Sequence, residues 1–293
     1  MAQRLRQRRG LVAGGGWDAA HALLAAAAAR RDDPVTTPPA RPRVGVDLGT
    51  ASCVLVVLDR DDDGEDRPVW VASAGSGALH DGVVVDFARA VATVRGLRER
   101  AQEALGVELP RAATAYPPCI PVADARACTY VCEAAGFDEV ALVDEVSAAQ
   151  RTLGVTDGVL VDVGGGSTGV GVFRGGELVR LDDRPGGGHH LDLVLAGALG
   201  IGLEDAERVK RERPAEALPI LTPGLHRIAE SVRAMLEPLE EPADATDLPL
   251  HLAGGALMLP LAGDVLATYL HRTVVTHPHA LLITPLGIAR SAP

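Results

Sequence analysis

Lysine is almost absent from this chain, since Lys210 is the single lysine among 293 residues. Arginine supplies the rest of the 28 basic side chains, against 39 acidic ones, and the formal net charge is −11. Residues 1–43 hold eight Arg and three acidic residues, so they carry +5 and the remainder carries −16. A nucleic-acid partner requires a cationic face against its phosphates. The acidic body therefore argues against nucleic acid as the main partner.

Aromatic side chains are also scarce, at 3% of the residues, although apolar residues reach 47%. The core must therefore be aliphatic, built from Ala, Val and Leu. No apolar run reaches the roughly 18–20 residues of a membrane-spanning helix, so we expect no membrane span. The start MAQRLRQRRG resembles the basic region of a secretory signal, but Asp18 and His21 interrupt the segment after it. We therefore expect a cytoplasmic protein.

Patterns typical of metal sites and disulfides are missing. The four cysteines form no C-x-x-C pair and have no histidine at metal-ligand spacing. His189 and His190 are adjacent at a predicted helix start, where neighbouring side chains point in different directions, so we do not expect them to bind a metal. Two cysteines stand one helical turn apart, which leaves a zinc site as the alternative to free thiols. We favour buried free thiols for Cys53, Cys119, Cys128 and Cys132.

The first 42 residues are interpreted as an extension ahead of the compact part of the chain. Residues 1–16 are rich in Arg and Gly and are expected to be disordered. Residues 17–31 (WDAAHALLAAAAARR) predict a short helix, with an acid near its start and two arginines at its end to complement the helix dipole. Residues 32–42 predict a stiff linker. The extension is either a dispensable tail or a helical address for a partner or an assembly.

From Arg43 onward, predicted strands alternate with predicted helices, which indicates an α/β architecture. Two strands joined by a tight turn are predicted at 44–59 and again at 159–173. Single strands are predicted at 81–87, after a polar loop, and at 113–118, 139–144 and 250–254. Helices are predicted at about 86–105, at 124–136 with Asp124 as N-cap, at 145–153 and over much of 189–240, and the segment 282–290 closes the chain.

The segment VLVDVGGGSTGVGVF (159–173) places three glycines inside a predicted strand pair. Glycine loses the most backbone entropy on ordering, so a run of three destabilises a strand. The run is either a flexible hairpin turn or a cradle of amide N–H groups for a phosphate. In the second case, Asp162 beside it can hold a metal ion.

A second copy of the pattern favours the phosphate cradle. VGVDLGTASCVLVVL (44–58) aligns with 159–173, which pairs Asp47 with Asp162, Gly49 with Gly164, and Ser52 with Ser167. The offset, 162 − 47 = 115 residues, suits two similar lobes rather than a solenoid. Amides in a tight turn converge on an anion, and a carboxylate at a strand end can bind Mg²⁺ through its waters. Two such turns facing each other favour a nucleotide, whose β- and γ-phosphates the metal neutralises.

This combination resembles the actin-like ATPase superfamily, which includes actin, MreB, sugar kinases and the DnaK-type chaperones. GVDLGTASCVLVV and LVDVGGGSTGVGVF resemble its two phosphate motifs, LHLAGGALMLP (250–260) its adenosine motif, ALVDEVSAAQRTLG (141–154) its connecting segment and AERVKRE (206–212) its nucleoside-contacting helix. Within the superfamily, DGVVVDF, ATAYPP, VDVGGGSTG, LVLAGALGI and ITPLGIA are most similar to the ethanolamine-utilisation EutJ family.

The resemblance implies two duplicated actin-like (ribonuclease H-like) lobes with a nucleotide cleft between them. Lobe I would cover 43–155 and lobe II 156–293, with about 282–290 returning to lobe I. The resemblance also implies a cytosolic, chaperone-like ATPase that serves a protein client of the ethanolamine pathway, often inside a bacterial microcompartment. Our hypothesis for the extension is that residues 17–31 recruit the protein to the microcompartment shell.

By the same resemblance, ATP and Mg²⁺ are the expected ligands. Asp47 and Asp162 would position Mg²⁺, and Asp162 and Glu145 would be catalytic, with Glu145 orienting the attacking water. Phosphate would be held by Gly49, Thr50, Ala51, Gly164, Gly165, Gly166 and Ser167, and the nucleoside by Glu207, Lys210, Gly254 and Gly255. Two alternatives stay open. Glu145 can be an acid stabilised by the helix dipole, and Glu207 and Lys210, one turn apart, can be an intrahelical pair.

The chain departs from the family pattern at positions that matter for hydrolysis. Val146 stands where the family usually has proline, and lobe I holds no lysine that could be catalytic. Gly169 and Ala51 stand where DnaK-type chaperones carry Asp and Thr. Loss of one charge-stabilising group commonly lowers a rate by ~10²–10³. We therefore expect ATP binding with slow or partner-dependent hydrolysis.

Three functions remain open on these grounds. The paired phosphate turns and the EutJ-like segments favour an ATP-dependent chaperone or reactivation factor, which is our prediction. The departures favour a non-catalytic, nucleotide-dependent scaffold or filament former, as among MreB-like proteins. A small-molecule kinase is the third possibility, but it needs an acceptor pocket for which the short lobes leave little room.

Overall fold

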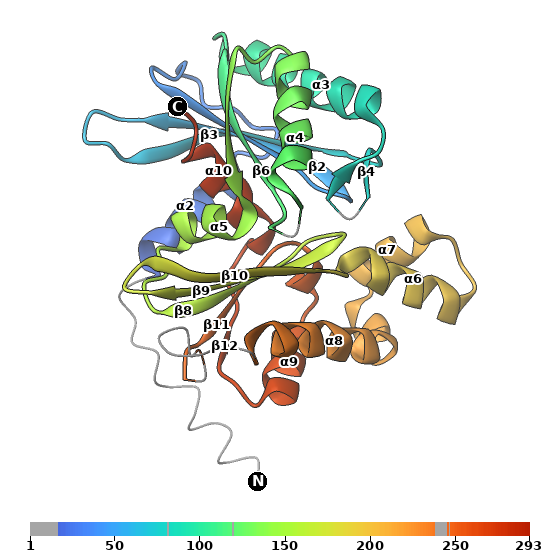
Figure 1. The fold of residues 1–293 in the computed structure, drawn as a ribbon. Helices are drawn as coiled ribbons and strands as arrows, with labels where there is room; N and C mark the ends of the chain where they lie inside the picture. Colours follow the sequence, from blue (N-terminus) through green and yellow to red (C-terminus); the bar gives the residue numbers. More distant parts are fainter. Residues whose placement is uncertain (1–16, 81, 119, 238–244, 246) are drawn as a thin grey trace.

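Two five-stranded sheets with the same plan form the framework of the protein (Figure 1). The computed structural model describes residues 17–80, 82–118, 120–237, 245 and 247–293. One sheet has the order β3-β2-β1-β6-β7 and the other β10-β9-β8-β11-β12. In the first sheet, β1, β2 and β3 are antiparallel neighbours, and β6 and β7 run parallel to β1. In the second, β8, β9 and β10 are antiparallel neighbours, and β11 and β12 run parallel to β8. We name the halves built on these sheets lobe I and lobe II. They confirm the predicted α/β fold with duplicated lobes.

The strands have these bounds. Lobe I contains β1 (Pro42–Leu48), β2 (Ser52–Arg60), β3 (Asp66–Gly75), β6 (Arg111–Tyr116) and β7 (Glu139–Asp144). Lobe II contains β8 (Gly158–Val163), β9 (Ser167–Arg174), β10 (Glu177–Pro185), β11 (Leu250–Ala253) and β12 (Val274–Val275). A separate two-stranded hairpin consists of β4 (Leu79–His80) and β5 (Val83–Val84).

Helices cover both sheets and fill the space between them (Figure 1). The α-helices are α2 (Asp18–Ala29), α3 (Phe87–Leu105), α4 (Val122–Ala134), α5 (Glu145–Leu153), α6 (Gly188–Leu199), α7 (Leu203–Glu212), α8 (Pro214–Leu236), α9 (Ala262–Leu270) and α10 (Ile283–Ala289). Two short 3₁₀ helices are η2 (Ala256–Met258) and η3 (Ala280–Leu282).

Two local predictions are wrong, and a third is right only in part. The predicted polar loop before residue 81 contains β3, an edge strand of the lobe I sheet. The predicted strand 81–87 is right in part: Val83–Val84 form β5, whereas Asp86 caps α3, since its carboxylate accepts a hydrogen bond from the Arg89 amide at 3.0 Å. Asp124 is not the N-cap of α4, since the helix begins two residues earlier and the Asp124 amide donates to the Pro121 carbonyl at 2.8 Å.

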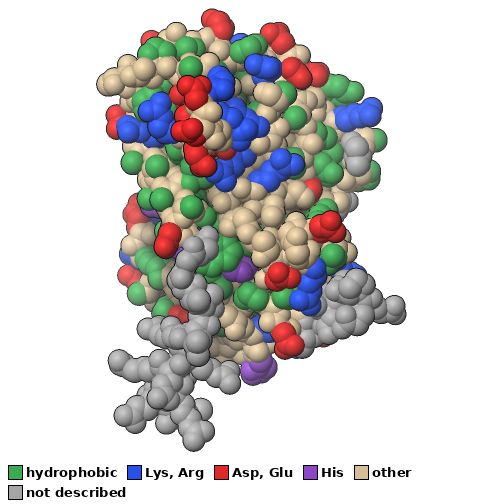
Figure 2. Space-filling model, turned by 90° about the vertical axis from the view of Figure 1, so that its left-hand side faces the viewer, with side chains coloured by type: hydrophobic (Ala, Val, Ile, Leu, Met, Phe, Trp, Pro, Cys, Tyr) green, Lys and Arg blue, Asp and Glu red, His purple; other side chains and the backbone are tan. Residues whose placement is uncertain are grey.

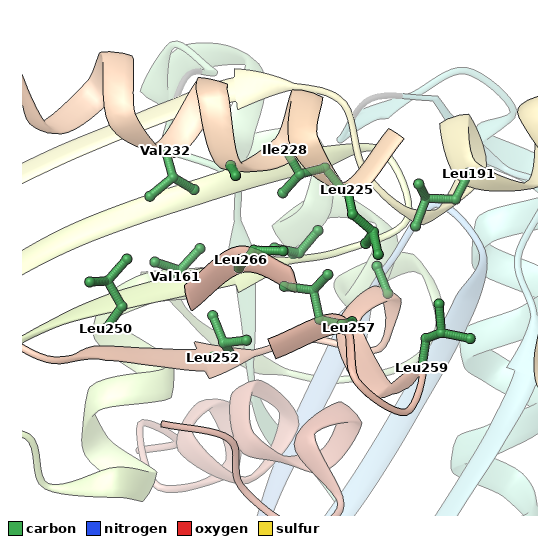
Figure 3. Close-up of a cluster of buried hydrophobic side chains, with 14 of the residues drawn as sticks. Val161, Leu191, Leu225, Ile228, Val232, Leu250, Leu252, Leu257, Leu259 and Leu266 are labelled. Atoms are coloured by element: carbon green, nitrogen blue, oxygen red, sulfur yellow. The ribbon is translucent and has the colours of Figure 1, made fainter. Parts of the chain in front are cut away.

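Each lobe has its own aliphatic core, as the shortage of aromatic residues predicts. Figure 3 shows part of the core of lobe II, where Val161 from β8 lies near Ile228 and Val232 from α8. The core of lobe I lies between its sheet and the helices α3 and α4. Among the described residues three cysteines are free and buried: Cys53, Cys128 and Cys132. The free-thiol prediction is confirmed for these three, and Cys119 lies outside the described residues.

Two helices, α5 and α10, lie between the sheets and join the lobes (Figure 1). They cross where Gly287 of α10 meets Ala148 of α5, and a Cβ atom at Gly287 would stand 1.7 Å from the Ala148 carbonyl oxygen. On its other side α10 packs against β1, where a Cβ atom at Gly45 would stand 2.4 Å from the Ala289 nitrogen. The last helix of the chain therefore packs on the first strand of lobe I. Glycine is required at both crossings because the backbones come too close for a side chain.

Ion pairs join the C-terminal end of the chain to lobe I. The buried Asp66 carboxylate lies 3.0 Å from Arg60 and 3.1 Å from Arg290, which follows α10. Arg43 on β1 donates to the carbonyl groups of Arg290 and Ala292 at 2.7 and 2.6 Å. Basic and acidic side chains lie close together on the lobe I half of the face in Figure 2. These contacts fix α10 against the end of the lobe I sheet.

The helix α2 is docked on the protein rather than separate from it. Its side chains Leu23, Leu24 and Ala27 are buried, in one cluster with β2 and β3 of lobe I and with η3 and α10. After the helix, the chain runs along β3, where the Asp32 and Val35 amides donate to β3 carbonyl groups at 2.8 and 3.2 Å. The predicted stiff linker is thus partly paired with the sheet.

The start of α2 contacts lobe II through a group of aromatic rings. The Trp17 ring lies 4.7 Å from the His251 ring of β11 and 5.3 Å from the His277 ring. His277 hydrogen-bonds both other histidines, with Nδ1 3.0 Å from Nε2 of His21 and Nε2 3.3 Å from Nδ1 of His251. The helix therefore spans both lobes. No helix of the described residues is long and apolar enough to cross a membrane.

Acid is expected to weaken the fold through this histidine chain. Burial lowers the pKa of His251 to about 4 and the pKa of His277 to about 3, whereas an unfolded histidine titrates near ~6.5. Below pH ~6.5 these histidines bind protons in the unfolded chain but not in the folded one. The stability that the neutral rings provide is therefore fully present above pH ~6.5 and is lost as the pH falls. The free energy of unfolding, measured by urea denaturation, should fall as the pH is lowered. Its slope should be up to ~1.4 kcal/mol per pH unit steeper in the wild type than in His277→Asn.

A matched control is His271→Asn, because His271 is exposed and its left-handed φ of 54° suits asparagine. Its pH slope should equal that of the wild type. Equal slopes for His277→Asn and the wild type would show that the buried ring does not resist protonation.

Candidate functional site

The two glycine turns predicted from the repeat meet between the lobes. Turn I, residues 49–51, joins β1 to β2, and turn II, residues 164–166, joins β8 to β9. Both have the same hydrogen bond, from the Gly49 amide to the Ser52 carbonyl and from the Gly164 amide to the Ser167 carbonyl, each at 3.1 Å. A Cβ atom at Gly165 would stand 3.1 Å from the Ala51 nitrogen. The structure thus places one turn against the other, with bare backbone at the contact.

A third glycine-rich turn supports turn II from lobe II. This turn III, residues 186–189, connects β10 to α6. The three carbonyl groups of turn II accept hydrogen bonds from it: Gly164 from the Gly188 amide at 2.9 Å, Gly165 from the His189 amide at 2.8 Å, and Gly166 from the Gly186 amide at 2.7 Å. A side chain at Gly187 would collide with turn II, since its Cβ atom would stand 2.4 Å from the Gly164 carbonyl oxygen.

Three carboxylates gather at the same place from three elements. Asp47 and Asp162 are the second-last residues of β1 and β8, and Glu145 begins α5. Burial, and next the charge of Asp162, raises the pKa of Asp47 to about 7. Burial also raises the pKa of Asp162 to about 6. The pKa of Glu145 is raised by burial first and then by Asp162 and Asp47. The structure therefore brings together the acids of both turns and the acid of the connecting helix.

The donor chemistry of these carboxylates fits Mg²⁺, which prefers oxygen ligands and keeps several of its waters. Within the described ranges, no three His, Cys, Asp or Glu side chains are placed to hold a metal ion by themselves. A hydrated Mg²⁺ needs only one or two carboxylates when phosphate oxygens complete its shell. Asp47 and Asp162 satisfy that smaller requirement.

Glu145 lies in the first turn of α5, directly after the N-cap. The Asp144 carboxylate caps the helix by accepting a hydrogen bond from the Ser147 amide at 2.7 Å. Asp144, and not Glu145, is therefore the N-cap of α5. The location of Glu145 is compatible with both expectations, an acid near the helix dipole and an acid close to Asp47 and Asp162.

The departures at Val146 and Gly169 belong to one packing contact. A Cβ atom at Gly169 would stand 3.1 Å from the Val146 side chain, and one at Gly171 would stand 2.3 Å from it. Val146 is fully buried and fills the space above these two glycines of β9. Val146 therefore leaves little room for a side chain at Gly169 and none at Gly171.

Sequence reasoning missed two further residues of the site. Asp183 of β10 pairs with Gly169, is buried, and its Oδ2 atom lies 3.3 Å from where a Gly169 Cβ would be. Its charge helps to raise the pKa of Glu145, after burial and the charges of Asp162 and Asp47. Thr284 of α10 donates a hydrogen bond to Asp162 at 2.5 Å. An available signal for Asp183 was the acid pair that precedes turn III by two residues, whereas nothing local distinguishes Thr284.

The glycine pair after β11 lies against the same acid. Gly254 has a φ of +84°, and a Cβ atom there would stand 2.4 Å from Asp162 Oδ1 and 2.3 Å from the Val163 carbonyl oxygen. At Gly255 a Cβ atom would stand 2.9 Å from the Leu281 side chain. This pair therefore allows the end of β11 to reach the carboxylate of Asp162.

Glu207 and Lys210 of α7 do not pair with each other. Glu207 is exposed and forms an ion pair with Arg211 at 3.5 Å. Lys210 is largely buried and lies 2.5 Å from the Asp192 carboxylate of α6. The intrahelical pair considered from the spacing is therefore wrong.

The adjacent histidines at the start of α6, His189 and His190, have their ring centroids 6.4 Å apart and their ring planes at 78° to each other.

Comparisons with known proteins extend over most of the chain. Ethanolamine utilization protein EutJ of Salmonella typhimurium is 36% identical over 249 residues, 85% of each chain. The protein of that name in Escherichia coli is 35% identical over the same shares. The crystal structure of ethanolamine utilization protein EutJ from Carboxydothermus hydrogenoformans has a TM-score of 0.83 at 38% identity, covering 92% of this chain and 97% of that chain.

More distant similarity concerns the MreB proteins. The family model for MreB/Mbl protein matches residues 76–215. Crystal structures of MreB5 of Spiroplasma citri, one bound to ADP and one bound to AMPPNP, have TM-scores of 0.67 and 0.66 at 16% identity, covering 85% of this chain and 95% of those chains. At that identity the likeness concerns the fold alone.

A pair of glycines tests the packing of Gly254 against Asp162. Gly254 and Gly64 have nearly the same φ, +84° and +85°, but a Cβ atom at Gly64 would have nothing within 4 Å. Gly64→Ala should therefore lower the free energy of unfolding only by the ~1–2 kcal/mol of left-handed strain. Gly254→Ala should lower it by at least ~1 kcal/mol more, because the Asp162 carboxylate and the Val163 backbone must move. Urea denaturation measures both, and equal losses would contradict the contact.

Proposed function

This chain belongs to the ethanolamine-utilisation EutJ family, within the actin-like ATPase superfamily, and from this premise we propose that it binds Mg-ATP between its lobes and assists a protein client of ethanolamine utilisation. The observation that carries the proposal is the meeting of turns I and II, with an acid at the end of each preceding strand. Tight turns of small residues present backbone amides that bind anions. The nucleotides in the two Spiroplasma MreB5 structures agree with a phosphate ligand for this fold.

The phosphates of ATP would lie between the two turns. Gly49, Thr50 and Ala51 would hold them from lobe I, and Gly164, Gly165, Gly166 and Ser167 from lobe II. Asp47 and Asp162 would hold Mg²⁺ mainly through its waters, and Thr284 keeps the Asp162 carboxylate in one orientation. When bound, the ion supplies neutralisation of charge on the β- and γ-phosphates.

Glu145 is the residue that we assign to the attacking water. It begins α5, which lies between the lobes, and the charges of Asp162 and Asp47 act on it. A carboxylate in such a place can orient a water and accept its proton. Asp183 adds a fourth carboxylate beside Gly169, from the neighbouring strand.

The nucleoside would lie at the lobe II end of the cleft. Gly254 and Gly255 follow β11 there, and bare backbone lets a flat base or sugar approach closely. Glu207 remains the proposed ribose contact, since its carboxylate is half exposed and its partner Arg211 is itself exposed. Lys210 lies on the same helix and is engaged with protein groups.

Hydrolysis should be slow, or should depend on a partner. Lobe I has no lysine to stabilise the charge of the transition state. Val146 packs against Gly169 beside Glu145, so the chain has neither the proline nor the acid that its relatives carry at these two positions. The alternative function, a nucleotide-dependent scaffold or filament former without hydrolysis, is favoured by no further contact. Polymers in sedimentation with nucleotide, and no phosphate release, would support it.

Mg-ATP should stabilise the protein strongly. A site occupied at ~1,000 times its Kd adds about 4 kcal/mol, which corresponds to a rise in melting temperature of about 8–16 °C for a protein of this size. Asp162→Asn should remove most of the rise, because it removes a negative ligand for the metal while keeping the shape of the side chain. Chelation of Mg²⁺ should act in the same direction. Thermal unfolding with and without nucleotide measures the effect.

The matched control is Asp157→Asn, because Asp157 is exposed just before the same strand β8. It should keep the full ATP-dependent rise. No shift with either ATP or ADP in the wild type would refute the proposal.

Association with a microcompartment shell through residues 17–31 remains part of the proposal. Docking buries Leu24 and leaves exposed a face of alanines that includes Ala22 and Ala26. Ala22→Glu with Ala26→Glu should abolish co-localisation of a fluorescent fusion with shells, whereas the exposed Ala198→Glu on α6 should not. Deleting residues 1–42 would be a poor test, because it also removes the buried Leu24. Unchanged localisation of the double variant would exclude this face.

A further inference from the structure

The hydrogen bonds between turns II and III determine which way the peptide groups of turn II point. All three carbonyl groups of residues 164–166 accept from amides of turn III. In a planar trans peptide the N–H of the next residue points opposite to the carbonyl. The amides of Gly165, Gly166 and Ser167 therefore point away from turn III. Turn III sets the direction in which turn II offers its donors.

The start of α6 is not itself available to a phosphate. Its first amides are those of Gly188 and His189, and both donate to turn II carbonyl groups at 2.9 and 2.8 Å. The next amide, that of His190, donates to the Gly187 carbonyl at 3.1 Å. The donors that usually make a helix N-terminus attractive to anions are thus used to hold turn II. The start of α6 therefore holds turn II in place instead of binding an anion itself.

Lys210 fixes that helix start from the neighbouring helix. Its ammonium group lies 2.5 Å from Asp192 Oδ1 and donates to the Gly188 carbonyl at 3.4 Å. Both partners belong to α6, and both the Lys210 and Asp192 side chains are largely buried, at 15% and 12% exposure. Burial raises the pKa of Asp192, and the nearby ammonium group of Lys210 opposes that shift. The pair therefore joins α7 to α6 at the residue that holds turn II.

We propose that Lys210, the single lysine of the chain, is a positioning residue for phosphate: with Asp192 it holds turn III, and turn III holds the amides of turn II in the direction that binds phosphate. The inference rests on the proposed binding of ATP. It differs from a direct contact between Lys210 and the nucleoside in a measurable way. A residue that acts through turn II affects ligands in proportion to their β- and γ-phosphates, whereas a contact with the nucleoside affects every ligand that contains adenosine.

The experiment measures the dissociation constants of ATP, ADP, AMP and adenosine, each with Mg²⁺, by competition against a fluorescent ATP analogue. Lys210→Met removes the charge and keeps the length of the side chain. We expect it to weaken ATP and ADP about tenfold and to leave AMP and adenosine within about twofold of the wild type. Lys210→Arg should bind ATP with an affinity within about threefold of the wild type, because a guanidinium can still reach Asp192 and the Gly188 carbonyl. Arg208→Met, an exposed position on the same helix, is the control and should change nothing.

A double-mutant cycle tests the pair. Asp192→Asn should weaken ATP as Lys210→Met does, and the double variant should be no weaker than the single variants, because both act on one unit. Hydrogen exchange of the ligand-free protein gives a second readout. The Gly188 and His189 amides should exchange faster in Lys210→Met and not in Arg208→Met.

Three results would overturn the inference. One is an equal loss of affinity for all four ligands in Lys210→Met, which would mean a contact with the nucleoside or a damaged fold. Another is an arginine variant as weak as the methionine variant. The third is unchanged exchange at turn III. Failure of the proposed function is recognised separately, because in that case the wild type itself does not bind the analogue.

Discussion

The contact between the backbones of turns I and II is the constraint on which the rest of this structure depends. Two sheets of the same order end at the same place, and a Cβ atom at Gly165 would already stand 3.1 Å from Ala51. Helices α5 and α10 bring the lobes to that distance by crossing at Gly287, where a side chain has no room either. Glycines stand at these two contacts between the halves, and the carboxylates near the ends of β1 and β8 come close as a consequence.

That arrangement is held from lobe II by hydrogen bonds rather than by apolar packing. Turn II gives all its carbonyl groups to turn III, and turn III is attached through Gly188 to the ion pair of Lys210 and Asp192. On the lobe I side the support is apolar, because Val146 fills the space over Gly169 and Gly171. A polar clamp and a packed apolar contact therefore flank the same set of carboxylates.

The N-terminal helix adds a connection between the lobes on another side of the molecule. Its leucines pack on lobe I, and Trp17 and His21 contact the histidines of lobe II. His251 belongs to β11, and the next residues along that strand lead to Gly254 beside Asp162. The helix and the candidate site are therefore connected to the two ends of one short strand.

Much of the fold and the site was determined by the sequence itself. The repeat of Asp47 and Gly49 at Asp162 and Gly164 predicts two equal lobes, because such turns must recur at the same point of equal sheets. The scarcity of aromatic residues predicts the aliphatic cores, and the pattern of 86–105 predicts α3. Each copy of the turn motif and the helical pattern consist of residues close together in the chain, so local spacing is enough to reveal them.

Only the tertiary structure decided which distant groups meet. Lys210 pairs with Asp192 rather than with Glu207, one turn away, because α6 and α7 pack side by side. Asp183 reaches the site from a strand next to Gly169, and Thr284 reaches Asp162 across 122 residues of sequence. Helix α2, which by sequence is a short helix before a linker, is buried against both lobes. Each of these contacts depends on how elements pack, and packing distances are not encoded in the spacing of neighbouring residues.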